Sequence, residues 1–185
     1  MTPESHAKSQ PRELKMQIRR AIKEDLHRIH AVHRESILGL CAAHYSAVEL
    51  AQWTDALRPD RYEALFASRE FFVAEADGQV LGFAVLDLRQ SLINATYVSP
   101  NAVRRGVGRS LVEAMESAAK KAGVSRLQLN STLNAAPFYE RLGYVRKEAT
   151  CNRLPTGVDL PCVLMMKDLR CLPAFSPETV HRDAL

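Results

Sequence analysis

The chain has 185 residues, of which 46% are hydrophobic and 25% are charged, as is ordinary for a folded globular domain. Its formal net charge of +4 is spread along the sequence and gives no case for nucleic-acid binding. Apolar runs stay short of the about 18 residues that a membrane span needs, and the four cysteines lack the paired spacing of a zinc site or a redox motif. We therefore expect a cytoplasmic protein with no metal, no nucleic-acid partner and no membrane partner.

The first third of the chain predicts one strand followed by helices. Residues 1–14 are polar and are expected to be a flexible leader, whereas the alternating residues 15–20 predict a strand. Apolar residues at helical spacing predict a helix from Leu26 to Leu40. Ser46-Ala47-Val48-Glu49 is a capping box, which predicts a second helix that stops before Pro59.

Three histidines, His27, His30 and His33, recur at every third position of the first predicted helix. Successive members of such a row are rotated by about 60° around the helix axis, and no carboxylate or cysteine accompanies them. We therefore favour a solvated or hydrogen-bonded face over a metal site.

The rest of the chain predicts a sheet with one parallel connection. Asp77-Gly78 lies between two apolar runs and predicts a tight hairpin. Residues 91–98 and 126–130 are strand-like and are joined by a helical segment, which predicts a right-handed βαβ unit with parallel strands. Residues 144–147 and 162–167 predict two further strands.

A glycine-bearing loop, Arg104-Arg105-Gly106-Val107-Gly108, opens the helix of that βαβ unit. A helix that begins here points unpaired backbone N–H groups and the positive end of its dipole into the loop, which favours an anion such as a pyrophosphate. Glu116 and Lys120 are expected to pair on the outer face of the helix. The loop alone is equally compatible with an ordinary turn that carries solvated arginines, and it is neither a P-loop nor a dinucleotide motif.

A second motif, Asn134-Ala135-Ala136-Pro137-Phe138-Tyr139-Glu140-Arg141-Leu142-Gly143-Tyr144, follows the strand at 126–130. Asn134 is a suitable N-cap, and Phe138 and Leu142 form an apolar pair one turn apart. Gly143 is expected to end this short helix.

The two motifs together resemble those of the GNAT N-acetyltransferase superfamily, whose cofactor loop is Q/R-x-x-G-x-G/A and whose later motif is N-A-x-x-F-Y-x-x-x-G-F/Y. Residues 134–144 match the later motif at every defined position, and residues 104–108 match the loop, although Val103 stands at its Q/R position. The resemblance implies an α/β (α+β) fold, with a mixed, mostly antiparallel sheet, a central splayed pair of parallel strands, and helices on both faces. It implies a single N-acetyltransferase domain over residues 15–169, followed by a C-terminal tail over 170–185.

The resemblance also implies a site for acetyl-CoA, with the pyrophosphate on the loop amides and the pantetheine arm between the splayed strands. Asn134 would hydrogen-bond that arm, and the backbone around Val98 would polarise the thioester carbonyl. Tyr139 is carried over as the general acid, because an ordinary tyrosine pKa of about 10 exceeds the about 8.5 of a thiol and keeps the hydroxyl protonated when the thiolate leaves. The implied cofactor-binding residues are Tyr97, Val98, Arg104, Arg105, Gly106, Val107, Gly108, Arg109, Ser110, Asn130, Asn134 and Tyr139.

The implied function is acetyl transfer to an amine of a small molecule or a peptide, by direct attack in a ternary complex. The attacking amine must lose a proton to a general base. The sequence leaves three candidates for that base, Glu75, His44 and Tyr97. Tyr45 and Trp53 are candidates for substrate contacts. Two alternatives stay open, namely a different acyl chain on CoA and a non-catalytic module that senses acyl-CoA. Homodimers are common in the superfamily, so a second copy of the chain is a further candidate partner.

Overall fold

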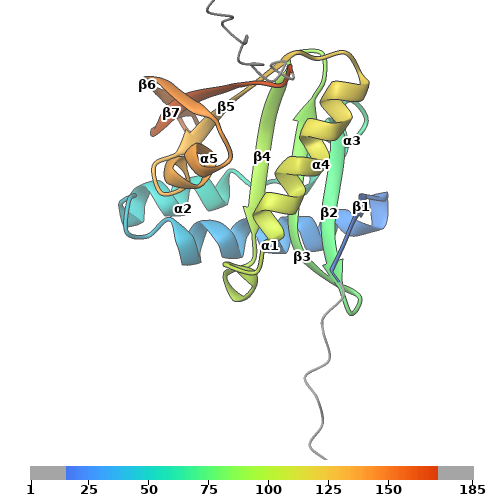
Figure 1. The fold of residues 1–185 in the computed structure, drawn as a ribbon. Coiled ribbons are helices and arrows are strands. Elements are labelled where there is room, and N and C mark those ends of the chain that lie inside the picture. The colour runs from blue at the N-terminus through green and yellow to red at the C-terminus, as the bar shows by residue number, and fades with distance from the viewer. Residues whose placement is uncertain (1–15, 171–185) are drawn as a thin grey trace, which may run out of the picture.

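The fold is built on a seven-stranded sheet in the order β1-β2-β3-β4-β5-β7-β6, described over residues 16–170 by a computed structural model (Figure 1). The strands are β1 (Gln17–Arg20), β2 (Glu70–Ala76), β3 (Gln79–Asp87), β4 (Leu92–Val98), β5 (Arg126–Thr132), β6 (Val145–Arg153) and β7 (Asp159–Asp168). The helices are η1 (Lys23–Asp25), α1 (Leu26–Leu40), α2 (Ala47–Asp55), α3 (Pro59–Phe66), η2 (Pro100–Ala102), α4 (Val107–Lys121) and α5 (Ala136–Arg141). Within these residues β4 and β5 are the one parallel pair, so the predicted mixed sheet is confirmed. The expected leader at 1–14 and, except for Arg170, the expected tail at 170–185 lie outside the described residues.

Helices cover both faces of the sheet, as predicted. Figure 1 shows α4 in front of the strands and α1 behind them. Leu111 and Met115 of α4 are fully buried in one apolar cluster, and Ile29 of α1 is fully buried in another on the opposite face. Strand residues alternate between the clusters, since Ala84 belongs to the first and Phe83 to the second. Over residues 16–170, no helix is both long and apolar enough to cross a bilayer.

Local sequence signals account for the ends of several elements. Asp77 and Gly78 both have positive φ angles, 49° and 72°, which is the backbone of the tight hairpin that joins β2 to β3. The Ser46 hydroxyl accepts a 3.3 Å bond from the Glu49 amide, and the Ser46 amide donates a 2.7 Å bond to the Glu49 carboxylate. The predicted hairpin and capping box are therefore confirmed.

The expected pair between Glu116 and Lys120 is wrong. The Glu116 side chain faces β7, where both of its carboxylate oxygens lie 2.8 Å from Nζ of Lys167. Glu116 is buried at the edge of the core, so a fixed partner from the sheet replaces the solvated partner one turn along the helix. Spacing along a helix identifies residues that are able to pair, but the neighbouring strand decides which pair forms.

The parallel pair β4–β5 is short and opens into a gap. The two strands are in register only at Leu92 with Gln128 and at Ile93 with Leu129. Beyond this point β4 continues to pair with β3 as far as Val98, while β5 pairs with β7 as far as Thr132. A β-bulge also interrupts the pairing of β3 with β4, because Ile93 and Ala95 oppose consecutive residues and Asn94 between them has no partner in the register.

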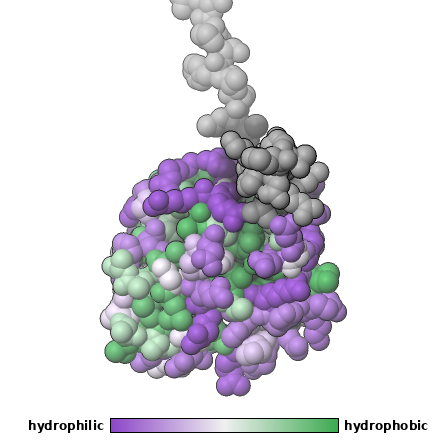
Figure 2. All heavy atoms as spheres, turned by 90° about the horizontal axis from the view of Figure 1, so that it is seen from below, coloured by the Kyte–Doolittle hydropathy of each residue, from purple (hydrophilic) through white to green (hydrophobic). Residues whose placement is uncertain are grey.

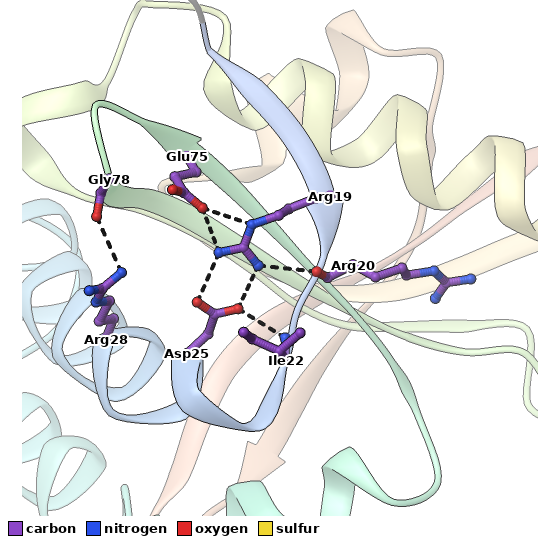
Figure 3. A network of polar contacts seen from close by, with 7 residues as sticks. All are labelled: Arg19, Arg20, Ile22, Asp25, Arg28, Glu75 and Gly78. Atoms are coloured by element: carbon purple, nitrogen blue, oxygen red, sulfur yellow. Dashed lines mark hydrogen bonds and ion pairs between the residues drawn. The ribbon is translucent and has the colours of Figure 1, made fainter.

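A network of charged side chains fixes the first strand to the rest of the sheet (Figure 3). The Arg19 guanidinium donates to Asp25 at 2.6 and 3.0 Å and to Glu75 of β2 at 2.7 Å. The Asp25 carboxylate also accepts a 2.9 Å bond from the Ile22 amide. Hydrogen bonds from Arg19 lower the pKa of Asp25, whose side chain is almost fully buried. The network therefore links β1, η1 and β2.

Asp25→Asn is expected to reduce the free energy of unfolding at pH 7 by about 2 kcal/mol, because it removes charge-assisted hydrogen bonds to Arg19. The folded pKa of Asp25 lies below its unfolded value, so this stabilisation is present above the unfolded pKa and is lost as the pH falls through the folded one. Urea unfolding at pH 7 and at pH 3 measures the difference, which should shrink at the lower pH. Asp77→Asn is the control, since Asp77 is exposed and asparagine suits the same turn. An equal loss for both variants, or a loss that grows at pH 3, would contradict the assignment.

Candidate functional site

A cleft of about 610 Å³ lies where β4 ends and α4 begins. Segments that are distant in sequence form its walls, including the end of α1, the end of β4, the start of α4 and one face of α5. Among the predicted cofactor-binding residues, those that line it are Tyr97, Val98, Arg104, Gly106, Val107, Gly108, Arg109, Asn134 and Tyr139. Figure 2 views the molecule from this end, where hydrophilic atoms surround smaller apolar areas.

The start of α4 offers backbone donors to the cleft. The first backbone bond of the helix runs from the Ser110 amide to the Gly106 carbonyl at 3.0 Å, so the amides of residues 107–109 have no acceptor within the helix. Gly106, the N-cap, has a φ of 81° that glycine adopts without strain. A Cβ on Gly108 would lie 3.2 Å from the Phe138 ring, tighter than ordinary contact. Both glycines are thus needed to bring free amides up to an open surface.

Arginines surround these amides unequally. Arg104 and Arg109 line the cleft, and Arg109 forms an exposed ion pair with Glu113 at 3.6 Å. Arg105, in contrast, lines a separate depression together with Arg28. Ser110 and Asn130 are the other predicted cofactor-binding residues that do not line the cleft.

A cavity of about 50 Å³ occupies the gap between β4 and β5 and continues the cleft. Thr96, Tyr97 and Tyr139 line both spaces. Asn130 lies on the far wall and donates a 3.2 Å hydrogen bond to the side chain of Asn152. The cleft therefore extends from the amides of α4 into the sheet itself.

Tyr139 is at the point where the cleft and the gap meet. It lies on α5 and is only 5% exposed. Burial raises the pKa of Tyr139 to about 12, against a smaller opposite effect of the Thr96 side chain. Its hydroxyl is therefore protonated throughout the physiological pH range.

Asn134 has a different local role from the predicted one. The N-cap of α5 is Ala135, and the Asn134 amide group donates a 3.1 Å bond to the Leu40 carbonyl at the end of α1. Its side-chain oxygen lies 3.6 Å from Sγ of Cys41, the donor of a weak hydrogen bond. The cap prediction was wrong because a carbonyl at the end of another helix is the partner of this side chain.

Glu75 and His44 do not line the cleft. The Glu75 carboxylate accepts the Arg19 hydrogen bond in the network of Figure 3, and His44 is exposed in the turn after α1. Tyr97 lines both spaces, but burial raises its pKa well above the ordinary value, so it stays protonated at neutral pH. None of the three base candidates thus combines a place in the cleft with a free basic group.

Tyr45 and Trp53, the candidates for substrate contacts, are buried together in a small apolar cluster. The Tyr45 hydroxyl donates to the Pro161 carbonyl at 2.7 Å and accepts from the Leu133 amide at 3.1 Å. These bonds join the turn after α1 to β7 and to the segment after β5. Both side chains are parts of the core rather than of the cleft walls.

Two of the three histidines on α1 have hydrogen-bond partners within the protein. His30 Nε2 lies 3.0 Å from the Leu57 carbonyl, and His33 Nδ1 lies 2.6 Å from the Tyr62 hydroxyl. His27 is exposed. In the part of the chain that the structure describes, no group of three metal-ligating side chains is placed to hold a metal ion.

Sequence reasoning missed Thr96 and Asn94 of β4, which line the gap between the splayed strands. Asn94 is the residue that the bulge leaves without a partner in β3. In a strand of only seven residues, a bulge does not visibly change the alternation of apolar and polar residues in the sequence. Phe138, which sets the space available above Gly108, was recognised only as part of an apolar pair.

Comparisons with known proteins agree on one family. Residues 41–155 match the family model described as "Acetyltransferase (GNAT) domain". The chain is 25% identical to the uncharacterised N-acetyltransferase YafP of Escherichia coli over 70% of its own length and 81% of that protein. A GCN5-related N-acetyltransferase from Rhodopseudomonas palustris superposes with a TM-score of 0.78 and 29% identity, over 82% of this chain and 94% of that one. The fold of yncA from Salmonella typhimurium, solved with its cofactor acetyl-CoA, is similar at a TM-score of 0.60 and 24% identity, over 88% and 99% of the two chains. The chain belongs to the GNAT acetyltransferase family.

Proposed function

We propose that the protein transfers the acetyl group of acetyl-CoA to an amine. The observation that carries this proposal is the unbroken course of the cleft, which begins at the free amides of α4 and ends beside the Tyr139 hydroxyl in the gap between β4 and β5. An anion-binding end and a proton donor are thus joined by a narrow space. The similar structure of yncA, which contains acetyl-CoA, supports the choice of this cosubstrate.

The residues of the cleft fit the chemistry of CoA. The amides of residues 107–109, with Arg104 and Arg109 beside them, would hold the diphosphate. The gap between the strands suits an extended arm, and Thr96 and Asn134 offer polar groups to its amides. Arg105, which faces a different depression, is not assigned to the diphosphate.

Acetyl-CoA, when bound, supplies the acetyl group as an activated thioester. The backbone at the end of β4 would orient the carbonyl of that group. Tyr139 holds its proton because of its raised pKa and would give it to the departing sulfur. Among the described residues, those that line the cleft include no carboxylate and no histidine, so we assign the proton of the attacking amine to water in the open cleft.

Calorimetric titration with acetyl-CoA and with desulfo-CoA tests the proposal. Both ligands are expected to bind with one site and similar affinity, because the proposed contacts involve the diphosphate and the arm rather than the sulfur. Desulfo-CoA, which has no thioester, is the necessary control, since Cys41 lines the cleft and a cysteine thiolate is able to attack the thioester of acetyl-CoA and release the CoA thiolate. A release of CoA thiol that depends on added amine would then establish the transfer. Failure of both ligands to bind would refute the proposed function.

A further inference from the structure

A second pocket lies on the α1 face of the sheet, close to the bulge of β4. This pocket, which we name the α3 pocket, has a volume of about 190 Å³ and is enclosed by α1, α3 and the strands β2 to β4. Its inner walls are mostly apolar and include Leu57, Phe71, Phe83 and Val85. The pair of His33 and Tyr62, 2.6 Å apart between Nδ1 and the hydroxyl, also lines it. An apolar cavity of about 150 Å³ is large enough to bind benzene, so the α3 pocket has room for one aromatic ring or one branched aliphatic chain.

The α3 pocket adjoins the same stretch of β4 as the proposed site of acetyl transfer. Asn94 and Ala95 line both the α3 pocket and the cavity between β4 and β5. That cavity in turn shares Thr96 and Tyr139 with the main cleft. A small molecule in the α3 pocket would therefore lie against β4 on the face opposite α4, beside the cavity that leads to the proposed acetyl position.

The charges around the α3 pocket are positive. Arg58 and Arg61 line it from the start of α3, and none of the described residues that line it is acidic. Arg58 forms an exposed pair with Asp60 at 3.3 Å, whereas Arg61 has no ion pair among the described residues. A guanidinium fork at the mouth of a small apolar pocket suits a carboxylate and disfavours a second cation.

We propose that the acceptor is an α-amino acid with an aromatic or branched apolar side chain, which occupies the α3 pocket while its carboxylate pairs with Arg61. This proposal rests on the proposed function and names its substrate class. The three groups of such a molecule diverge from one carbon, so the side chain fills the apolar space and the carboxylate stays at the arginines. The amine is then left to point along β4 towards Asn94.

The same charges favour the reaction. Nearby positive charge disfavours a protonated amine, so the guanidinium groups raise the share of the neutral, nucleophilic form. A polyamine or an aminoglycoside would instead bring several cations to a mouth without a described carboxylate. The side-chain amide of Asn94 has an oxygen that accepts from the amine and would orient it.

Fluorine NMR with 4-fluoro-L-phenylalanine as the probe tests this directly, without turnover. The CoA-saturated protein is expected to bind the probe at least about tenfold more tightly than 4-fluorophenethylamine, which has the same ring and amine but lacks the carboxylate. Arg61→Ala should remove most of this preference and leave the affinity for 4-fluorophenethylamine within about twofold. Arg34→Ala is the matched control, since Arg34 is an exposed helical arginine that does not line the pocket. Leu65→Trp, at a half-exposed position on the rim, should occlude the pocket and weaken both probes.

Thiol release completes the test with leucine, phenylalanine, glycine, spermidine and kanamycin as acceptors. Leucine and phenylalanine are expected to give the highest kcat/KM. Equal binding of the two fluorinated probes, or an Arg61→Ala variant that binds both as the parent does, would overturn the substrate class. Faster turnover of spermidine or kanamycin would overturn it and leave the acetyltransferase proposal standing. Absence of acetyl-CoA binding would refute the acetyltransferase proposal, and the same probe measurements on the protein without CoA would still decide whether the pocket selects amino acids.

Discussion

The double variant Gly106→Glu/Gly108→Glu is expected to lose acetyl-CoA binding, with an affinity at least about 100-fold below that of the parent. A Cβ at residue 108 would press on the Phe138 ring at 3.2 Å, and both residues line the cleft. Two carboxylates beside the free amides of α4 would also occupy and repel the diphosphate position. Calorimetric titration with acetyl-CoA measures the loss.

The chain offers a matched control for strain and charge. Gly106 and Gly157 both have positive φ angles, 81° and 89°, and in both a Cβ would meet nothing within 4 Å. Gly106→Glu and Gly157→Glu therefore carry the same backbone strain and the same added charge, but Gly157 lies in the turn between β6 and β7. We expect only Gly106→Glu to weaken binding. Equal affinities of the two single variants would show that the start of α4 does not hold the diphosphate.

Tyr139→Phe is expected to reduce kcat by about 100-fold and to leave the dissociation constant for acetyl-CoA within about twofold. The change removes the hydroxyl that lies beside the gap and keeps the buried aromatic ring of α5. Because the pKa of Tyr139 is about 12, the activity of the parent should show no alkaline decline from this group below about pH 10. Steady-state thiol release between pH 6 and pH 10 measures both effects.

Tyr144→Phe is the matched control for this experiment. Its ring centroid lies 5.5 Å from that of Tyr139, it is equally buried, and it does not line the cleft. We expect it to turn over acceptors at nearly the rate of the parent. A Tyr139→Phe variant with the activity of the parent would refute the assignment of the general acid. A protein that binds acetyl-CoA and releases no thiol with any acceptor would instead be a sensor.

The sequence allowed the framework of the fold to be predicted, because its signals are local. The turn at Asp77-Gly78, the capping box at Ser46 and the helix that starts at the glycine loop depend on neighbouring residues only. The parallel pair followed from the helical connection between β4 and β5. The motif that contains Tyr139 identified a residue that the structure places beside the gap.

Contacts between distant segments could not be predicted in the same way. The partner of Glu116 is 51 positions away, and Asn134 bonds to the end of a helix 94 positions away. Glu75 is bound to Arg19, and only the pairing of β1 with β2 reveals this. Arg105 follows Arg104 directly, yet Arg104 lines the cleft and Arg105 lines the separate depression, because the backbone at Arg104 has a φ of 62°. The bulge at Asn94, a residue that lines the α3 pocket, likewise depends on the pairing with β3.

The short ladder between β4 and β5 gives the sheet two inner edges. Beyond this ladder, β4 remains paired with β3 and β5 remains paired with β7. Residues 95–98 and 130–132 are therefore hydrogen-bonded to a neighbouring strand on one side and face the gap on the other. Inner edges of this kind are templates for an extended chain. The pantetheine arm of CoA is extended and contains amides, so under the proposed function it would enter the sheet as an eighth, non-peptide strand. The gap would then select its ligand by backbone complementarity, which side-chain substitutions along β4 leave largely intact.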